Sequence, residues 1–217
     1  MVIGLLPASG SAKRLGGLPK FSLPISENTS LLEHHVMLMR DVCDEIRIST
    51  RAEWIRILEN MNLGSAIVTE YEPSTMLDAV HKLVKLGGEE FIVGMPDTCY
   101  LGFAENPYKS LANTQGDVAL GLWACDDSLR GKVGQVRTEA SGVVVEVIDK
   151  VASCDFPEMW GAFKFNSKNT LDLSLENPSL QFQKWIDEGT TISSSTIQGR
   201  YIDAGSFSGV KDLYISL

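Results

Sequence analysis

The sequence predicts an α/β protein, a three-layer α/β/α sandwich around a mixed, mostly parallel central sheet. Up to about residue 100, short apolar runs typical of buried strands alternate with segments in which apolar residues recur at helical period. Strands separated by helices of about ten residues require right-handed crossovers, which build a parallel sheet covered on both faces. Beyond that point strand-like segments follow one another with few helices between them, so a mixed sheet or a β-rich extension is expected there.

The chain begins with an element that predicts the centre of the sheet. Val2 to Pro7 is almost wholly apolar and is followed by Ala-Ser-Gly, which is typical of a strand buried on both faces and then a loop. Ser30 and Glu33 have the spacing of a capping box, which predicts a helix over 30–42. The same patterns predict strands over 45–50, 66–69 and 91–95, and helices over 53–61 and 76–86.

The second half of the chain is richer in strands. Its patterns predict strands over 118–123, 134–137, 142–148 and 160–165, a helix over 180–188, short strands over 191–197 and 201–203, and a helix over 208–217. The sequence contains no internal repeat, low-complexity tract or Pro-rich linker. We therefore expect a single domain over 1–217, which at 217 residues can bury a full core without disulfide or metal staples.

Composition argues against several classes of function. The chain has 19 Lys and Arg against 28 Asp and Glu, a net charge of −9, which argues against a nucleic-acid partner because phosphate backbones require clustered cations. The apolar runs are shorter than the ~18 residues of a membrane span, and the first run lacks the basic region of a signal peptide. No C-x-x-C pair occurs among Cys43, Cys99, Cys125 and Cys154, so we expect reduced thiols in a cytoplasmic protein.

The loop after the first strand is the most informative stretch. Residues 5–25 bring Gly10, Arg14 and Lys20 together directly after a parallel strand, at the edge where such sheets bind ligands. A run of small residues lets backbone N–H groups approach a phosphate, and the two cations would neutralise a polyphosphate. The stretch lacks the G-K-[ST] ending of a P-loop and the G-x-G-x-x-G of a dinucleotide fold. An ordinary loop with two solvated cations is the alternative at this point.

Five segments of the chain, in the same order, resemble the sugar-phosphate nucleotidylyltransferases. The first, Leu6 to Leu15 with Pro19-Lys20, is similar to that family's L-A-x-G-x-(G/S)-x-R-(L/M) loop and its P-K. The others are Glu72 to Val80 (E-P-x-G-T-A-D-A-L), Met95 to Asp97 (an aspartate that ends a strand), Val147 to Lys150 (V-x-E-K-P) and Tyr201 to Gly205 (W-x-D-x-G). Trp160 to Phe165 looks like the strand that follows the fourth segment. Five ordered segments are more specific than any one alone.

The resemblance implies a Rossmann-like fold of the nucleotide-diphospho-sugar transferase type and a Mg²⁺-dependent reaction. In that family a sugar 1-phosphate attacks the α-phosphate of a nucleoside triphosphate and expels pyrophosphate, so the site must neutralise several negative charges. The two metal aspartates correspond to Asp97 and Asp203, each of which could otherwise be a turn residue. Catalytic roles fall on Arg14, which would hold the outgoing phosphates, on Lys20 at the α-phosphate and on Lys150 at the acceptor phosphate.

The resemblance also implies residues that bind the two substrates. The nucleotide-binding residues would be Leu6, Ala8, Ser9, Gly10, Ser11, Glu72, Ser74 and Thr75. The residues that bind the acceptor substrate would be Asp149, Lys150 and Gly161. The expected partners are a nucleoside triphosphate and a sugar 1-phosphate, with no nucleic acid and no membrane; the oligomeric state is left open.

Several other polar and aromatic residues are interpreted as structural. Asp78 has capping-box spacing with Thr75, which favours a role at the start of a helix. The histidines, on expected helices, are interpreted as helix-surface or satisfied core residues: His34, His35 and His81. Aromatic residues on expected strands could line a sugar pocket but are more often core: Trp123, Trp160 and Phe163.

Departures from the family pattern leave the substrates open. Thr75 and Pro96 each replace a glycine, and the Cβ of Thr75 would restrict the approach of a nucleobase. The motif Pro96 to Thr98, with Gly121 to Trp123, is most similar to the branch of the family that transfers thymidylyl or uridylyl groups to glucose 1-phosphate, so the resemblance favours dTTP or UTP. The Leu31 to His34 segment is similar to cytidylyltransferases for polyol or choline phosphates, which is the alternative enzyme. A non-catalytic relative that binds a nucleotide or nucleotide sugar is the third interpretation.

Overall fold

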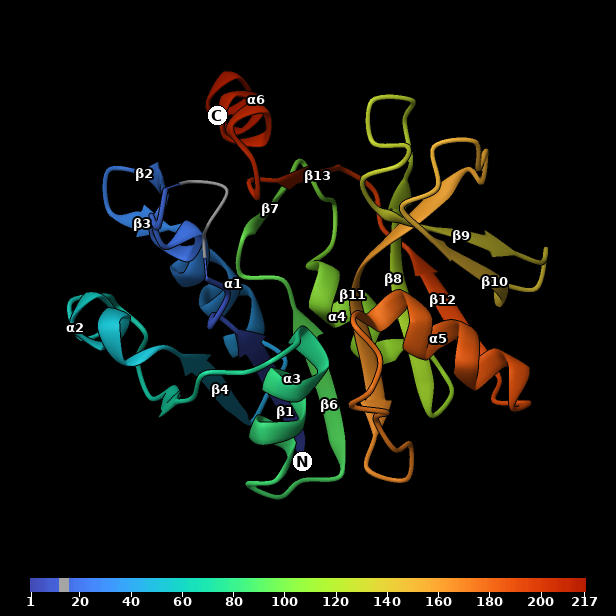
Figure 1. Ribbon diagram of the computed structural model, residues 1–217, viewed down its shortest axis with the longest axis horizontal. Coiled ribbons are helices and arrows are strands. Elements are labelled where there is room, and N and C mark those ends of the chain that lie inside the picture. Colours follow the sequence, from blue (N-terminus) through green and yellow to red (C-terminus); the bar gives the residue numbers. More distant parts are fainter. Residues whose placement is uncertain (12–15) are drawn as a thin grey trace.

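The computed structural model describes residues 1–11 and 16–217 (Figure 1). Within these residues nine strands form one sheet. In spatial order they are β5 (Ile67–Glu70), β4 (Glu45–Thr50), β1 (Val2–Pro7), β6 (Glu90–Gly94), β11 (Glu158–Asn166), β8 (Val118–Ala124), β12 (Ile192–Thr196), β10 (Val143–Asp149) and β9 (Gly134–Thr138). The first strand of the chain thus lies inside the sheet, as its apolar sequence predicts.

The sheet is mixed, which confirms the coarser expectation of an α/β fold with both strand orientations. β5, β4, β1 and β6 are parallel, and β12 is parallel to β8. β11 runs antiparallel to β6, β8 and β9, and β10 runs antiparallel to β12 and β9. Five of the nine pairings between described strands of this sheet are therefore antiparallel, and the expectation of a mostly parallel sheet holds only for its first half. The cause is that short loops, rather than crossover helices, join several strands of the second half.

Five of the six helices in the described residues begin at a side-chain cap. The six are α1 (Leu31–Arg40), α2 (Ile55–Leu58), α3 (Met76–Val84), α4 (Pro107–Asn113), α5 (Pro178–Asp187) and α6 (Phe207–Ser216), and α2 is the exception. The capping box of α1 is confirmed, because the Ser30 N–H donates to Glu33 Oε2 at 2.8 Å and the Glu33 N–H donates to Ser30 Oγ at 3.3 Å. Ser206 caps α6 with its side chain only, and its Oγ accepts from the Gly209 N–H at 3.2 Å.

Three elements differ from the sequence prediction. The helix expected over 53–61 consists of a 3-10 turn, Ala52–Trp54, and the single turn α2, because Asn60, Asn62 and Gly64 favour turns over helix. The helix α4 was not expected, although Asn106 caps it and Pro107 occupies its first position, a usual start signal. The third element is β7 (Thr98–Leu101), which lies outside the large sheet.

The apolar core consists of two clusters that meet at the sheet. One packs α1 and α4 against it, and includes Leu6 of β1. The other packs α3 and α5, which lie in front of the sheet in Figure 1, and includes Ile3 and Leu5 of the same strand. Burying one such side chain contributes about 1.5–3 kcal/mol. Alternate residues of β1 thus contribute side chains to the two clusters.

A two-stranded ribbon stands above the carboxyl edge of the sheet. β7 pairs antiparallel with β13 (Arg200–Asp203), in a register that places Thr98 opposite Asp203. A third apolar cluster, which includes Cys99, Ile202 and Leu213, packs this ribbon against α6. The ribbon therefore brings two segments more than a hundred residues apart to one place. A second ribbon, β2 (Pro24–Ser26) with β3 (Thr29–Ser30), precedes α1.

Two further observations bear on the composition argument. Each cysteine is a free thiol, at positions 43, 99, 125 and 154. Among the helices of the described residues, every one is too short or too polar to cross a lipid bilayer.

Candidate active site

A cleft of about 770 Å³ runs along the carboxyl ends of four parallel strands. The loops that follow β1, β4, β5 and β6 line one half of it with Pro7, Ala8, Ser9, Gly10, Ser11, Arg51, Glu72, Pro73, Ser74, Thr75, Met95, Pro96 and Asp97. Later segments line the other half with Lys132, Val133, Gly134, Asp149, Lys150, Trp160, Asn177, Pro178, Tyr201 and Asp203. The position is the usual ligand edge of such a sheet, and the volume suits a small-molecule site.

Most of the residues that the resemblance implies line this cleft. They are Ala8, Ser9, Gly10, Ser11, Lys20, Glu72, Ser74, Thr75, Asp97, Asp149, Lys150 and Asp203. The side chain of Leu6 is instead buried in the core. Gly161 lies behind Tyr201, because a Cβ at Gly161 would lie 2.3 Å from the tyrosine ring. Arg14 falls outside the described residues.

Two aspartates and one lysine form the polar centre of the cleft. Asp97 precedes β7 and Asp203 ends β13, so the ribbon register brings both carboxylates to one end. The Ala204 N–H donates to the Asp97 carbonyl oxygen at 3.0 Å, which closes this end of the ribbon. Lys20 Nζ donates to Asp97 Oδ2 at 3.1 Å, and the Gly205 N–H donates to Asp203 Oδ1 at 2.6 Å.

The donor set at this centre fits Mg²⁺. Mg²⁺ is usually held by one or two carboxylates, with phosphate oxygens and water completing its six ligands. Asp97 and Asp203 supply that number, and both line the same cleft. Among the described residues no group of three or more His, Cys, Asp or Glu could hold a metal alone. The two carboxylates would supply two of the six ligands, and water or phosphate oxygens would supply the others.

The electrostatics of Tyr201 support this description of the centre. Burial raises the pKa of the Tyr201 hydroxyl well above its usual value, and the nearby Tyr100, Asp203 and Asp97 raise it further. The phenol thus stays protonated at neutral pH. Asp97 and Asp203 thus both lie near the same buried hydroxyl, and two neighbouring carboxylates favour a bound cation.

The loop after β1 is held by an arginine that the sequence reasoning did not single out. Arg51 Nε donates to the Ser9 carbonyl oxygen at 3.0 Å, and Arg51 Nη1 donates to Glu72 Oε1 at 2.5 Å. It therefore ties the loops after β1, β4 and β5 together. Ser9 is 2% exposed, and its hydroxyl has no hydrogen-bond partner within the described part of the chain. A buried, unpaired hydroxyl in a cleft wall is suited to a ligand.

The segment before α3 presents its backbone to the cleft. Asp78 is confirmed as a capping residue: Asp78 N–H donates to Thr75 Oγ1 at 3.1 Å, and the Ser74 N–H donates to Asp78 Oδ2 at 2.8 Å. Burial alone would raise the pKa of Asp78, but hydrogen bonds from Ser74 and Tyr71 hold this pKa below its usual value. The carboxylate thus serves α3, while Ser74 and Thr75 line the cleft.

The far half of the cleft is built around Asp149 and Lys150. Asp149 accepts hydrogen bonds from Ser179 Oγ at 3.0 Å and from Asn177 Nδ2 at 3.1 Å, which fixes the start of α5. Trp160 Nε1 donates to the same Ser179 hydroxyl at 2.8 Å. Lys150 has a φ of 54°, which is unique among the described non-glycine residues. Backbone held in that region is unfavourable and is concentrated at functional sites.

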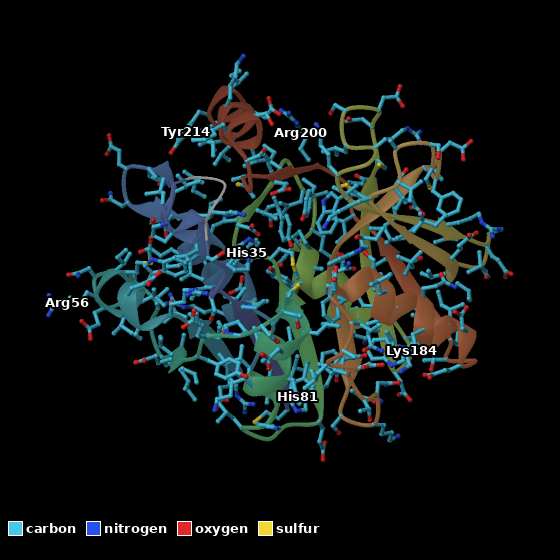
Figure 2. All side chains as sticks on the ribbon, in the orientation of Figure 1. His35, Arg56, His81, Lys184, Arg200 and Tyr214 are labelled. Atoms are coloured by element: carbon cyan, nitrogen blue, oxygen red, sulfur yellow. The ribbon has the colours of Figure 1, made fainter. Side chains whose placement is uncertain are left out.

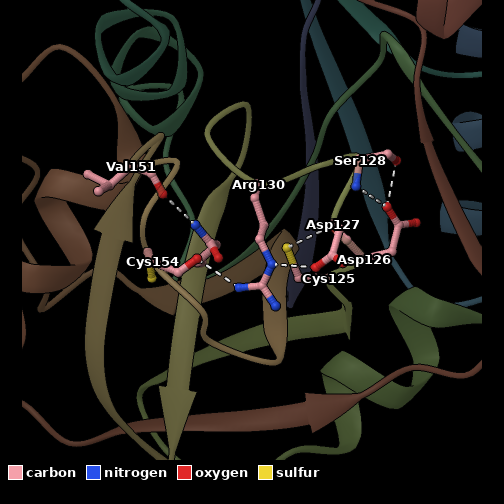
Figure 3. Close-up of polar contacts among 8 residues, drawn as sticks. Cys125, Asp126, Asp127, Ser128, Arg130, Val151 and Cys154 are labelled. Carbon is pink, nitrogen blue, oxygen red and sulfur yellow. Dashed lines mark hydrogen bonds and ion pairs between the residues drawn. The ribbon is translucent and has the colours of Figure 1, made fainter.

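A second arginine connects the two loops that carry the cations of this half (Figure 3). Arg130 Nε donates to Asp127 Oδ1 at 2.8 Å, and Arg130 Nη1 donates to the Cys154 carbonyl oxygen at 2.7 Å. The Lys150 N–H also donates to the Val133 carbonyl oxygen at 3.1 Å. These bonds keep the loop after β8 beside the loop after β10. An exposed lysine of the first loop, Lys132, thereby joins the cleft.

The remaining candidates divide between core and cleft. Trp123 and Phe163 are buried, which confirms them as core residues, whereas Trp160 lines the cleft. His34 and His35 are buried on α1. Sequence reasoning missed Arg51 and Lys132. A signal existed for Arg51, because it directly follows a predicted parallel strand at the ligand edge; none existed for Lys132.

Comparison with solved structures shows the fold. A putative glucose-1-phosphate thymidylyltransferase from Bacillus anthracis has a TM-score of 0.81 at 16% identity, with 100% of this chain and 95% of that chain covered. A UDP-glucose pyrophosphorylase complexed with UDP-glucose has a TM-score of 0.84 at 17% identity, with 100% and 98% covered. An inositol-1-phosphate CTP transferase from T. maritima has a TM-score of 0.72 at 15% identity, with 97% and 94% covered.

These three structures are nucleotidylyltransferases, so the resemblance drawn from the sequence segments is confirmed at the level of the fold. No protein-family model matches the chain, and no curated protein sequence matches it. The similarity therefore resides in the arrangement of strands and helices.

Proposed function

We propose that this protein is a Mg²⁺-dependent nucleotidyltransferase that joins a nucleoside triphosphate to a sugar 1-phosphate, giving a nucleoside-diphosphate sugar and pyrophosphate. One observation carries this proposal. The β7–β13 ribbon brings Asp97 and Asp203 together beside Lys20, in a cleft at the ligand edge of the sheet. The fold shared with three nucleotidylyltransferases supports it.

The proposed reaction is a direct displacement. An oxygen of the acceptor phosphate forms a bond to the α-phosphorus while the bond from that phosphorus to pyrophosphate breaks. Catalysis is then positioning and charge neutralisation, so no covalent nucleophile is needed. Asp97 and Asp203 would hold Mg²⁺, which when bound supplies positive charge to the phosphate oxygens. Lys20, 3.1 Å from Asp97, is placed to stabilise charge at the α-phosphate.

The first half of the cleft would bind the nucleotide. Its small residues Ala8 to Ser11 leave the backbone accessible, and a Cβ at Gly10 would have no atom within 4 Å. The Ser9 hydroxyl, which has no hydrogen-bond partner among the described residues, and the Arg51 guanidinium are additional donors there. Arg14 stays a predicted ligand of the outgoing phosphates. We favour dTTP or UTP, as in the solved structures named for thymidylyl transfer and UDP-glucose.

The second half of the cleft would bind the acceptor. Lys150 is 58% exposed and, among the described residues, makes only a long ion pair with Asp149, 3.8 Å from Nζ to Oδ2, so it stays the proposed acceptor-phosphate ligand. Asp149 already accepts two hydrogen bonds from the start of α5, which suits a carboxylate that fixes the pocket wall as well as one that contacts the acceptor. Gly161 would contribute by leaving room for the Tyr201 ring, which lines the pocket.

A cytidylyltransferase acting on a polyol phosphate is the second candidate. The similarity to an inositol-1-phosphate CTP transferase favours a polyol phosphate over choline phosphate as the acceptor. We further propose that residues 1–217 act as one domain with α/β/α layering, in the cytoplasm and without nucleic acid or membrane partners. The apolar clusters that pack helices on either side of β1 support the layering.

The test is pyrophosphate release by the purified protein with Mg²⁺. dTTP, UTP, CTP, GTP and ATP are each combined with glucose 1-phosphate, other sugar 1-phosphates, inositol 1-phosphate and choline phosphate. We expect release only with one triphosphate and one acceptor together, and loss of release in Asp97→Asn. Asp212→Asn, on the exposed side of α6, is the matched control and should keep the wild-type rate. Nucleotide binding with no release across the grid would refute the transferase and favour a non-catalytic nucleotide-binding protein.

A further inference from the structure

A buried histidine joins α1 to the ribbon that carries both aspartates. The imidazole of His35 is fully buried, with Nδ1 2.6 Å from the Tyr108 hydroxyl and Nε2 2.9 Å from the Thr98 carbonyl oxygen. Figure 2 shows His35 near the middle of the molecule. Thr98 directly follows Asp97 and pairs with Asp203. The His35 side chain thus links α1 to Thr98, the residue that follows Asp97 and pairs with Asp203.

The partners of the imidazole determine where its proton lies. A carbonyl oxygen can only accept, so Nε2 carries the hydrogen and donates to Thr98. Nδ1 then has a lone pair and accepts from the Tyr108 hydroxyl. Burial, together with the neighbouring His34, lowers the pKa of His35 to about 3. The ring is therefore neutral at physiological pH and has one tautomer.

The neighbouring residues restrict the His35 imidazole to one position. A Cβ at Gly94 would lie 2.0 Å from the Tyr108 hydroxyl oxygen, so a glycine is required for this tyrosine to reach the histidine. The Tyr100 ring meets the imidazole edge-on at 5.0 Å between centroids, and its hydroxyl donates to the Gly161 carbonyl oxygen at 3.0 Å. Tight packing on every side means that a displaced imidazole would displace its neighbours.

We propose that His35 is a positioning residue for the two metal-binding carboxylates; this inference rests on the proposed function. The imidazole donates to the Thr98 carbonyl oxygen and so fixes the position of the first residue of β7. The orientation of Asp97 relative to Asp203 depends on that position. A leucine at position 35 would leave that carbonyl and a buried hydroxyl unpaired, so the ribbon would move to regain partners. Groups that orient metal ligands are worth about 10- to 100-fold in metal affinity or activity.

The test measures binding of Mn²⁺ alone, by the loss of the free-ion signal in electron paramagnetic resonance. We expect Asp97→Asn to abolish binding and His35→Leu to weaken it at least 10-fold. His35→Gln should recover most of the affinity, because its amide nitrogen can donate to Thr98. His81→Gln is the matched control, because His81 lies on α3, a helix that packs against the large sheet and not against the ribbon. It should bind like the wild type.

Tyr108→Phe keeps the experiment decisive if His35→Leu does not fold. It removes only the hydroxyl that orients the imidazole, and we expect an intermediate loss of Mn²⁺ affinity. Wild-type affinity in folded His35→Leu, or in Tyr108→Phe where the leucine variant is unfolded, would overturn the proposal. Failure of the wild type to bind Mn²⁺ would also overturn it. Failure of the substrate grid with Mn²⁺ binding intact would remove the proposed reaction and leave the role of His35 standing.

Discussion

Gly205 is the position where a single methyl group would test how the polar centre is assembled. A Cβ built there would lie 2.6 Å from Asp203 Oδ1 and 3.1 Å from Lys20 Nζ. Non-bonded carbon contacts settle near ~3.5 Å, so the carboxylate in Gly205→Ala has to move by roughly 1 Å. A misplacement of about 1 Å costs about 100-fold in rate, which corresponds to about 2.7 kcal/mol in the activation barrier.

The assay is the initial rate of pyrophosphate release at saturating substrates, with melting temperature measured on the same samples. We expect kcat of Gly205→Ala to fall about 100-fold, because no charge is removed but the carboxylate no longer faces the phosphate correctly. Gly189→Ala is the matched control: it places a methyl group in open space at a φ of +86°, far from the cleft, and should lower stability while keeping kcat. A rate for Gly205→Ala within threefold of the wild type would refute the geometry argued for the site.

Other variants separate the two halves of the cleft and the buried histidine. Arg51→Met should raise KM for the nucleotide about tenfold with kcat nearly unchanged, whereas Arg56→Met, at the periphery in Figure 2, should behave as the wild type; equal KM values would exclude a nucleotide role. Ser179→Ala, which removes the hydroxyl linking α5 to β10 and β11, should raise KM for the acceptor only, and Ser174→Ala should not; a change in nucleotide KM instead would contradict the assignment of the halves. The pKa of His35 is about 3 in the folded protein, so between pH 6.5 and 3 the unfolded chain binds one more proton than the folded chain. The free energy of unfolding should therefore fall by about 1.4 kcal/mol for each unit by which the pH is lowered across that window. Urea unfolding should show a shallower fall for His35→Gln between pH 6.5 and 4.5, and parallel curves would count against the buried neutral imidazole.

Local signals predicted the first half of the fold well. The apolar run of β1, the capping box of Ser30 and Glu33, and the helical period of α3 each depend on residues a few positions apart, so one sequence is enough to find them. The α2 region fails because a periodic pattern does not say that Asn60 and Asn62 will end the helix early. The helix α4 was missed although its Asn-Pro start lies in the sequence.

The sequence motifs predicted several residues of the site but not the tertiary contacts that bring them together. Asp97 and Asp203 were identified from segments, but their meeting depends on β7, an element with no expected pairing partner in the sequence. Lys132 joins the cleft through hydrogen bonds made by Arg130 to a distant loop. Contacts of this kind depend on tertiary packing, which periodicity and spacing do not encode.

The pairing of β7 with β13 also has a consequence for how activity arises during folding. Closing a loop of about a hundred residues costs on the order of 4 kcal/mol of chain entropy, which the ribbon alone does not recover. The four parallel strands that precede β7 can assemble from contacts closer in sequence. The two carboxylates should therefore meet late, after the sheet has formed. Under mild denaturation the same ribbon should open first, so catalysis should be lost at a lower urea concentration than helical circular dichroism.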